Sequence, residues 1–123
     1  MKTFLLALLI APGLALAADP PKKDAKKDAK AAVAAPDPAV VAEGAKLFQD
    51  RTCWSCHGKD AKTPIMPAYP KLAGQNAEYA ERQMLDIKSG ARANANAAAM
   101  KGVMGLVNDA EIKTISIYLS TLQ

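Results

Sequence analysis

Cys53-Trp54-Ser55-Cys56-His57 is the stretch that decides how this chain folds, and it holds both cysteines and the only histidine in the sequence. Two thiols two residues apart, followed directly by an imidazole, form the attachment signature of a c-type haem. The sulfurs of Cys53 and Cys56 can form thioethers with the porphyrin vinyl groups, and His57 can bind the iron from one face. The motif therefore predicts one covalently bound haem c.

Three other interpretations of this motif fit the sequence less well. A redox dithiol of the thioredoxin type needs βαβ units around the cysteines, and no strand pattern lies nearby. A structural zinc site needs about four Cys or His ligands, whereas the chain offers three. A disulfide across two residues would leave His57 without a role. Haem attachment accounts for all three side chains, so we take it as the prediction.

The first residues predict export. Lys2 precedes an almost wholly apolar run over 4–16, and Ala15-Leu16-Ala17 has the small-x-small pattern of a cleavage site. This is the pattern of a secretory signal peptide over 1–17, cleaved after Ala17 or Ala18. The run is too short for the roughly 20 residues of a membrane-spanning helix. We therefore expect a periplasmic protein without a transmembrane anchor.

Residues 18–36 have a different composition, rich in alanine, lysine and proline, and predict a flexible tether. The tether contains five Lys and three Asp, so it carries +2 of the chain's net charge of +4. The remaining 37–123 region holds ten basic and nine acidic residues. This near neutrality argues against nucleic-acid binding. The tether is either a passive linker or a basic arm for an acidic partner or an anionic membrane surface.

Residues 37–123 suit one small all-α domain with three to four helices around the haem. Asp37-Pro38 begins a first helix, with Asp as N-cap and Pro at the first position. A second helix is predicted over 76–89, and a third begins at Asn108 with a capping box. We expect the third helix to cross the first near Gly44, with Tyr118 close by. Loops are predicted over 58–75 and 91–107.

The second axial ligand cannot be a histidine of this chain, so Met, Lys or an open position remains. Met84 falls on the apolar face of the second helix, which favours a core role, and Met66 follows too soon after the motif. Met100 and Met104 lie in the segment before the last helix, which is free to cover the far face of the haem. A thioether ligand there would raise the reduction potential.

Further motifs resemble those of class I cytochromes c, particularly the cytochrome c-553 group and single domains of dihaem cytochrome c4. The residues that carry the resemblance are Pro70-Lys71-Leu72-Ala73-Gly74-Gln75, then Gln83, Asp86, Lys88-Ser89-Gly90 and Arg92, then Met100-Lys101-Gly102-Val103. The resemblance covers about 40–123. The chain departs from the family pattern in its cap, which is Asn108 where Ser is usual, and in having only one CxxCH where dihaem cytochrome c4 has two. Trp54 within the motif is also bulkier than the residue usual there. The single CxxCH predicts a monohaem protein.

The resemblance implies a role for each site residue. It favours Met100 over Met104 as the axial ligand opposite His57, because of the spacing to the Asn108 cap. It implies that the Pro70 carbonyl accepts the Nδ1 proton of His57. Arg92 is a candidate partner for a haem propionate, with a solvated surface arginine as the alternative.

The resemblance also implies a function: a non-enzymatic, monomeric one-electron carrier between respiratory or photosynthetic redox partners. Its donor would be a quinol-oxidising complex or a dehydrogenase, and its acceptor a terminal oxidase or similar protein. Two alternatives stay open. One is a dedicated cytochrome subunit of a periplasmic dehydrogenase, and the other is a ligand-binding or peroxidase-like haem protein.

Overall fold

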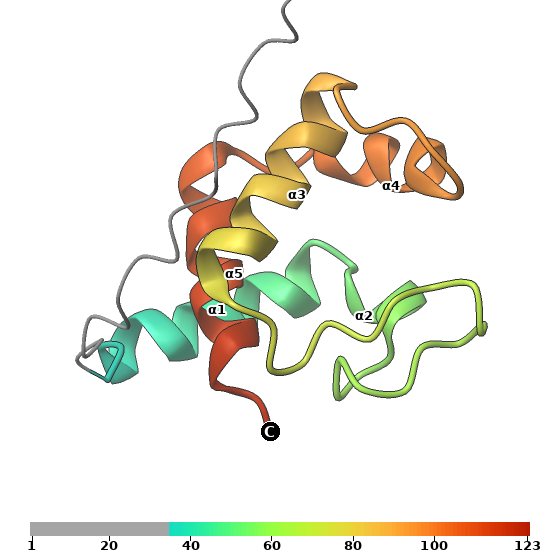
Figure 1. The fold of residues 1–123 in the computed structure, drawn as a ribbon. Coiled ribbons are helices and arrows are strands. Elements are labelled where there is room, and N and C mark those ends of the chain that lie inside the picture. Colours follow the sequence, from blue (N-terminus) through green and yellow to red (C-terminus); the bar gives the residue numbers. More distant parts are fainter. Residues whose placement is uncertain (1–34) are drawn as a thin grey trace, which may run out of the picture. The chain divides into compact units, whose positions relative to one another are not determined.

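The computed structural model describes residues 35–123, and this part of the chain contains helices and no strands. The signal peptide expected over 1–17, and the tether as far as residue 34, lie outside the described residues. None of the helices in 35–123 has the length and hydropathy needed to cross a bilayer. The five helices shown in Figure 1 are α1 (Pro38–Asp50), α2 (Trp54–His57), α3 (Ala77–Ser89), α4 (Ala97–Met104) and α5 (Asp109–Thr121).

The three long helices begin where the sequence predicted, and in each a side chain caps the first turn. The Asp37 carboxylate accepts from the Ala39 amide at 2.8 Å, which satisfies a helix N–H that has no partner within the helix. Asn76 caps α3, and α3 ends at Gly90 in a left-handed conformation (φ 90°). Asn108 and Glu111 form the full capping box of α5. The predicted all-α class is confirmed.

The prediction of a loop over 91–107 is wrong for residues 97–104, which form α4. Gly102 and Gly105 suggested a loop, yet a run of alanines and Met100 are strong helix formers. A Cβ at Gly102 would meet nothing within 4 Å, so this glycine is not required by packing. Counting the single turn of α2, the described residues contain five helices, one more than the upper limit of the three to four predicted.

Gly44 allows α1 and α5 to pack closely, as the sequence predicted. A Cβ built on Gly44 would lie 2.5 Å from Tyr118 Cβ and 2.6 Å from the Thr114 carbonyl oxygen. Only a residue without a Cβ therefore fits this contact. The aromatic rings of Phe48 and Tyr118 pack beside it, with their centroids 5.9 Å apart. This contact fixes the end of α1, which leads directly into the cysteine motif.

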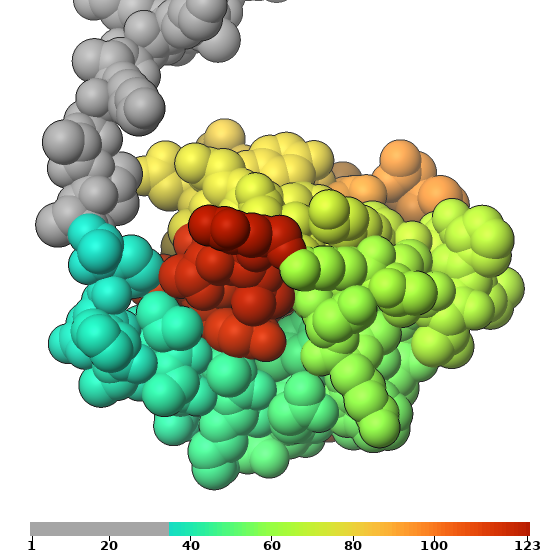
Figure 2. Space-filling view, turned by 90° about the horizontal axis from the view of Figure 1, so that it is seen from below, coloured from blue at the N-terminus to red at the C-terminus, as the bar shows by residue number. Residues whose placement is uncertain are grey.

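The core lies between α1, α3 and α5, with α4 packed on α3. Its fully buried side chains include Phe48, Met104, Val107, Ile112, Ile115 and Leu119. The Gly74 amide donates to the Leu119 carbonyl at 2.9 Å and holds the 58–75 loop against the end of α5. Figure 2 shows the C-terminal residues at the surface, bordered by α1 and by this loop. The loop is therefore fixed to the helical core at its C-terminal end.

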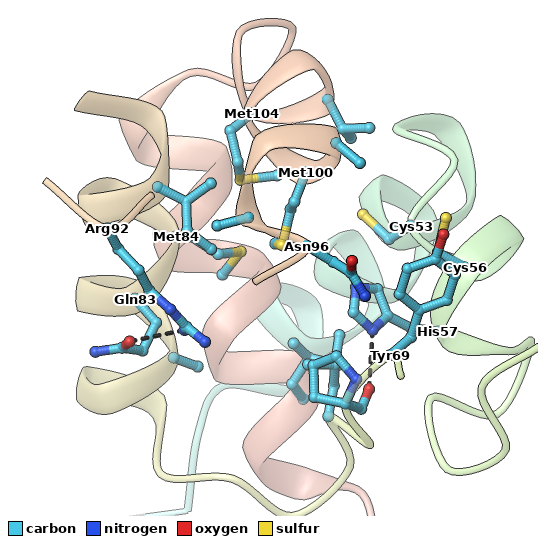
Figure 3. A pocket seen from close by; sticks show the side chains of 18 of the residues that line it. Cys53, Cys56, His57, Tyr69, Gln83, Met84, Arg92, Asn96, Met100 and Met104 are labelled. Atoms are coloured by element: carbon cyan, nitrogen blue, oxygen red, sulfur yellow. Dashed lines mark hydrogen bonds between the residues drawn. The ribbon is translucent and has the colours of Figure 1, made fainter. Parts of the chain in front are cut away.

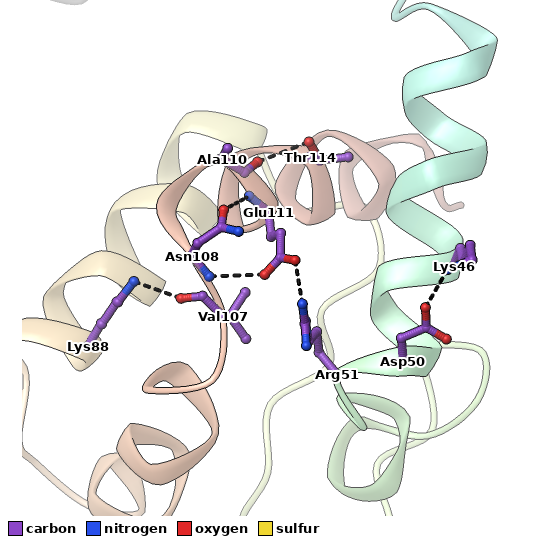
Figure 4. A network of polar contacts seen from close by, with 9 residues as sticks. All are labelled: Lys46, Asp50, Arg51, Lys88, Val107, Asn108, Ala110, Glu111 and Thr114. Carbon is purple, nitrogen blue, oxygen red and sulfur yellow. Dashed lines mark hydrogen bonds and ion pairs between the residues drawn. The ribbon is translucent and has the colours of Figure 1, made fainter.

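A polar network joins the ends of three helices (Figure 4). The Arg51 guanidinium, just after α1, contacts the Glu111 carboxylate of α5 at 2.5 Å. Lys88 of α3 donates to the Val107 carbonyl and to Asp109, at 2.7 Å each. The hydrogen bond from Arg51 and that from the Asn108 amide hold the pKa of Glu111 below its usual value. The network joins the start of α5 to the segment that enters the motif.

Candidate haem-binding site

The cysteine motif forms one helical turn that places its three reactive side chains on one side. The His57 amide donates to the Cys53 carbonyl at 3.1 Å, which closes the turn. Side chains three and four residues apart on a helix are neighbours, so Cys53, Cys56 and His57 face one cavity. Both thiols are free and half-buried. The turn therefore presents two sulfurs and an imidazole to the same space.

His57 is positioned by a hydrogen bond from the loop that follows α2. Its side chain is buried, and Nδ1 lies 2.9 Å from the Pro70 carbonyl oxygen. A carbonyl oxygen only accepts, so Nδ1 carries the proton and Nε2 keeps its lone pair. Burial lowers the pKa of His57, although the Pro70 bond opposes this shift. The result is a neutral imidazole with a free nitrogen, as a metal ligand requires.

The thiols do not have the environment of a redox dithiol. Burial raises the pKa of the Cys53 thiol to about 11. Reactive cysteines in redox CxxC motifs instead have a lowered pKa, because the thiolate is the nucleophile. No strand accompanies the motif in residues 35–123, so the βαβ context of a thioredoxin is also missing there. Both observations argue against the dithiol interpretation.

The cavity between the motif and helices α3, α4 and α5 has a volume of about 240 Å³. Figure 3 shows it with the motif on one side and the side chains of α3 and α4 on the other. Its apolar lining includes Phe48, Leu72, Met84, Ile87, Val103 and Leu119. A flat, largely apolar macrocycle gains stability when such a surface replaces water around it. The lining and the donor atoms at the motif therefore fit a haem.

Three methionines line the cavity opposite the motif, and they differ in burial. Met84 and Met104 belong to the core, at 6% and 1% exposure. Met100 is half-buried at the edge of that core, and Figure 3 shows its sulfur projecting from α4 into the cavity. Met66, by contrast, is 48% exposed and does not line the cavity. Of the methionines that line this cavity, Met100 is therefore the one whose sulfur is least held by the core and freest to bind a group inside the cavity.

Polar side chains lie at the rim of the same cavity. Arg92 is exposed and lines the cavity, and its Nη1 donates to Gln83 Oε1 of α3 at 2.8 Å. Sequence reasoning found Arg92 but missed this partner, because the bond joins α3 to a loop nine residues away. It also missed Tyr69, whose ring centroid lies 6.4 Å from that of His57. No spacing rule in the sequence identifies either contact.

Comparisons with known proteins agree with this geometry. Residues 41–123 match the family described as Cytochrome c. The chain is 31% identical over 101 residues to cytochrome c4 of Stutzerimonas stutzeri, covering 76% of this chain and 48% of that protein. It is 30% identical over 91 residues to the thiosulfate dehydrogenase electron acceptor of S. stutzeri strain A1501, covering 68% and 41%.

A solved structure also resembles this fold. The crystal structure of reduced recombinant cytochrome c4 from Pseudomonas stutzeri matches with a TM-score of 0.62 at 32% identity, over 71% of this chain and 50% of that one. The chain thus spans about half the length of the cytochrome c4 relatives that it matches.

Proposed function

Because this chain belongs to the cytochrome c family, whose domain carries covalent haem c, we propose that it is an exported, monohaem one-electron carrier. The single CxxCH motif supports one haem. Haem c supplies an iron centre that accepts and releases one electron. The protein's part is to hold the haem, to fill both axial positions and to exclude water. Each of these tasks has candidate residues around one cavity.

Cys53 and Cys56 would anchor the macrocycle, and His57 Nε2 would bind the iron. The Pro70 carbonyl would keep the imidazole in the correct tautomer and make it a stronger donor. Met100 would supply the opposite ligand, with Met104 as the alternative. A thioether favours ferrous iron and raises the potential, and a filled sixth position leaves no site for small ligands. Arg92, held by Gln83, would pair with a propionate.

The observation that carries this proposal is the arrangement of His57 and Met100 around one cavity. A buried neutral imidazole with a free Nε2 lies on one side, and a half-buried thioether projects from the other. An iron held from both sides needs little rearrangement between its two oxidation states. That property suits a carrier better than an enzyme that must bind a substrate at the iron.

The partners we propose are a quinol-oxidising complex or a dehydrogenase as donor, and a terminal oxidase or similar protein as acceptor. The similarity to a thiosulfate dehydrogenase electron acceptor favours a second candidate function, in which this protein serves one dehydrogenase as its dedicated cytochrome. Retention of the chain by one large dehydrogenase during purification from its natural source would support that second candidate. Periplasmic export is proposed from the signal-like residues 1–17.

Visible spectra of the purified ferrous protein, with and without carbon monoxide, test the ligation. The native protein should not bind carbon monoxide at neutral pH, because both axial positions are filled. Met100→Ala should bind it readily and should lower the reduction potential. Met104→Ala is the matched control in the same helix, and it should stay six-coordinate. If only Met104→Ala opens the iron, the ligand is Met104, and ready binding by the native protein would overturn His/Met ligation.

A further inference from the structure

We propose that Asn96, at the start of α4, is a positioning residue that donates a hydrogen bond from its side-chain amide to the sulfur of Met100. The inference rests on the proposed function, because the bond has a purpose only where Met100 binds the iron. There it would fix the orientation of the thioether and set its strength as a ligand. Asn96 is not among the residues to which the resemblance to class I cytochromes assigns a role.

Asn96 begins α4 but does not cap it. Its side chain forms no hydrogen bond to the first turn, whereas the side chains of Asn76 and Asn108 cap α3 and α5. An N-cap residue usually has an extended backbone, and Asn96 instead has φ −84° and ψ 10°. Ala95 before it has a φ of 49°, which is uncommon for a residue with a Cβ. The Asn96 amide is therefore not used by its own helix.

The Asn96 side chain lines the same cavity as the cysteine motif and Met100. Figure 3 shows its amide among the side chains that project into this cavity. The amide is exposed to water in the described structure. With water excluded from a haem-filled cavity, it needs a hydrogen-bond partner there, because a polar group buried without one is costly.

Met100 is the partner within reach of Asn96. The Met100 amide donates to the Asn96 carbonyl at 3.5 Å, so the two residues lie one turn apart on the same face of α4. Long side chains on a helix lean toward its N-terminus, which directs the Met100 thioether toward Asn96. A thioether sulfur is an acceptor, and only the nitrogen end of an amide donates. Binding to iron uses one sulfur lone pair and leaves the second for Asn96 Nδ2.

The reduction potential reports this bond. The N–H group withdraws electron density from the sulfur, so the thioether stabilises ferric iron less and the potential rises. Asn96→Leu keeps a branched side chain of similar size and removes the donor. At a fixed applied potential, this variant should shift the ferric-to-ferrous ratio about two- to fivefold toward ferric, for a hydrogen bond of ordinary net strength. That shift corresponds to a potential lowered by about 20 to 40 mV.

Ala98→Gly is the matched control, because it weakens α4 without changing the cavity. Ala98 is exposed and does not line the cavity, and glycine disfavours a helix. The control should keep the potential of the natural protein. Equal shifts in Asn96→Leu and Ala98→Gly would show that Asn96 acts only through helix stability, which would overturn the proposal.

Proton NMR of the ferrous holoprotein separates the hydrogen bond from the ligation itself. The porphyrin ring current should shift the Met100 methyl protons far upfield, and these protons should show a nuclear Overhauser effect to the Asn96 amide protons. A shifted methyl without that contact, or with an unchanged potential in Asn96→Leu, would overturn the positioning role alone. A Met100 methyl without the upfield shift would overturn His57/Met100 ligation, and this inference with it.

Discussion

Replacing Gly44 by alanine should weaken the contact between α1 and α5 that fixes the approach to the motif. The new Cβ would lie 2.5 Å from Tyr118 Cβ and 2.6 Å from the Thr114 carbonyl oxygen. Neither atom is the far end of a flexible side chain, so the helices must move apart. Overpacking of this kind costs up to about 3 kcal/mol.

The intrinsic helix propensity of alanine offsets about 1 kcal/mol of that cost. The net loss should be about 2 kcal/mol of unfolding free energy, or about 10 °C in Tm for a domain of this size. Guanidinium unfolding of the oxidised holoprotein, followed by far-ultraviolet circular dichroism, measures it. The unfolding midpoint should fall while the m-value stays unchanged.

Gly102→Ala is the matched control, because it makes the same substitution inside another helix. A Cβ at Gly102 would meet nothing within 4 Å, so only helix propensity acts. This variant should be more stable than the natural protein, by up to about 1 kcal/mol. The reasoning about the close contact fails if Gly44→Ala is as stable as the natural protein, or if the two variants shift in the same direction.

Two further perturbations test the core and the polar network. Ile112 has no exposed surface, so Ile112→Ala should lose about 2–5 kcal/mol in urea unfolding, and a loss under 1 kcal/mol would contradict its place in the core. The pKa of Glu111 lies below its ordinary 4.5 because Arg51 and the Asn108 amide stabilise the carboxylate. Its contribution is therefore complete above pH 4.5 and is lost as pH falls through the folded-state pKa. Glu111→Gln keeps the capping-box geometry and should flatten the acid side of the stability–pH curve; an unchanged curve would show that the ion pair contributes nothing.

Local signals in the sequence were sufficient for the cofactor and for the three long helices. The CxxCH spacing identifies a covalent haem because each side chain has one chemical task within five consecutive residues. Asp37, Asn76 and Asn108 predicted helix starts because a cap acts on the backbone two or three residues away. Gly44 predicted the crossing of α1 and α5 because a glycine within a helix lacks a Cβ and lets another helix approach closely.

Tertiary structure alone decided which distant groups meet. The sequence of α4 predicted a loop because its two glycines disfavour a helix, although its run of alanines favours one. The contacts of this segment with α3 stabilise the helix, and the sequence does not show them. The bond between Arg92 and Gln83, and the position of Tyr69 beside His57, depend on how a loop lies on a helix. Burial of Met104 and partial exposure of Met100 follow from the neighbours of each sulfur in space. The sequence thus specified the cofactor, and the fold arranged the cavity that would hold it. The contacts that shape this cavity join residues too far apart along the chain for a local sequence pattern to predict them.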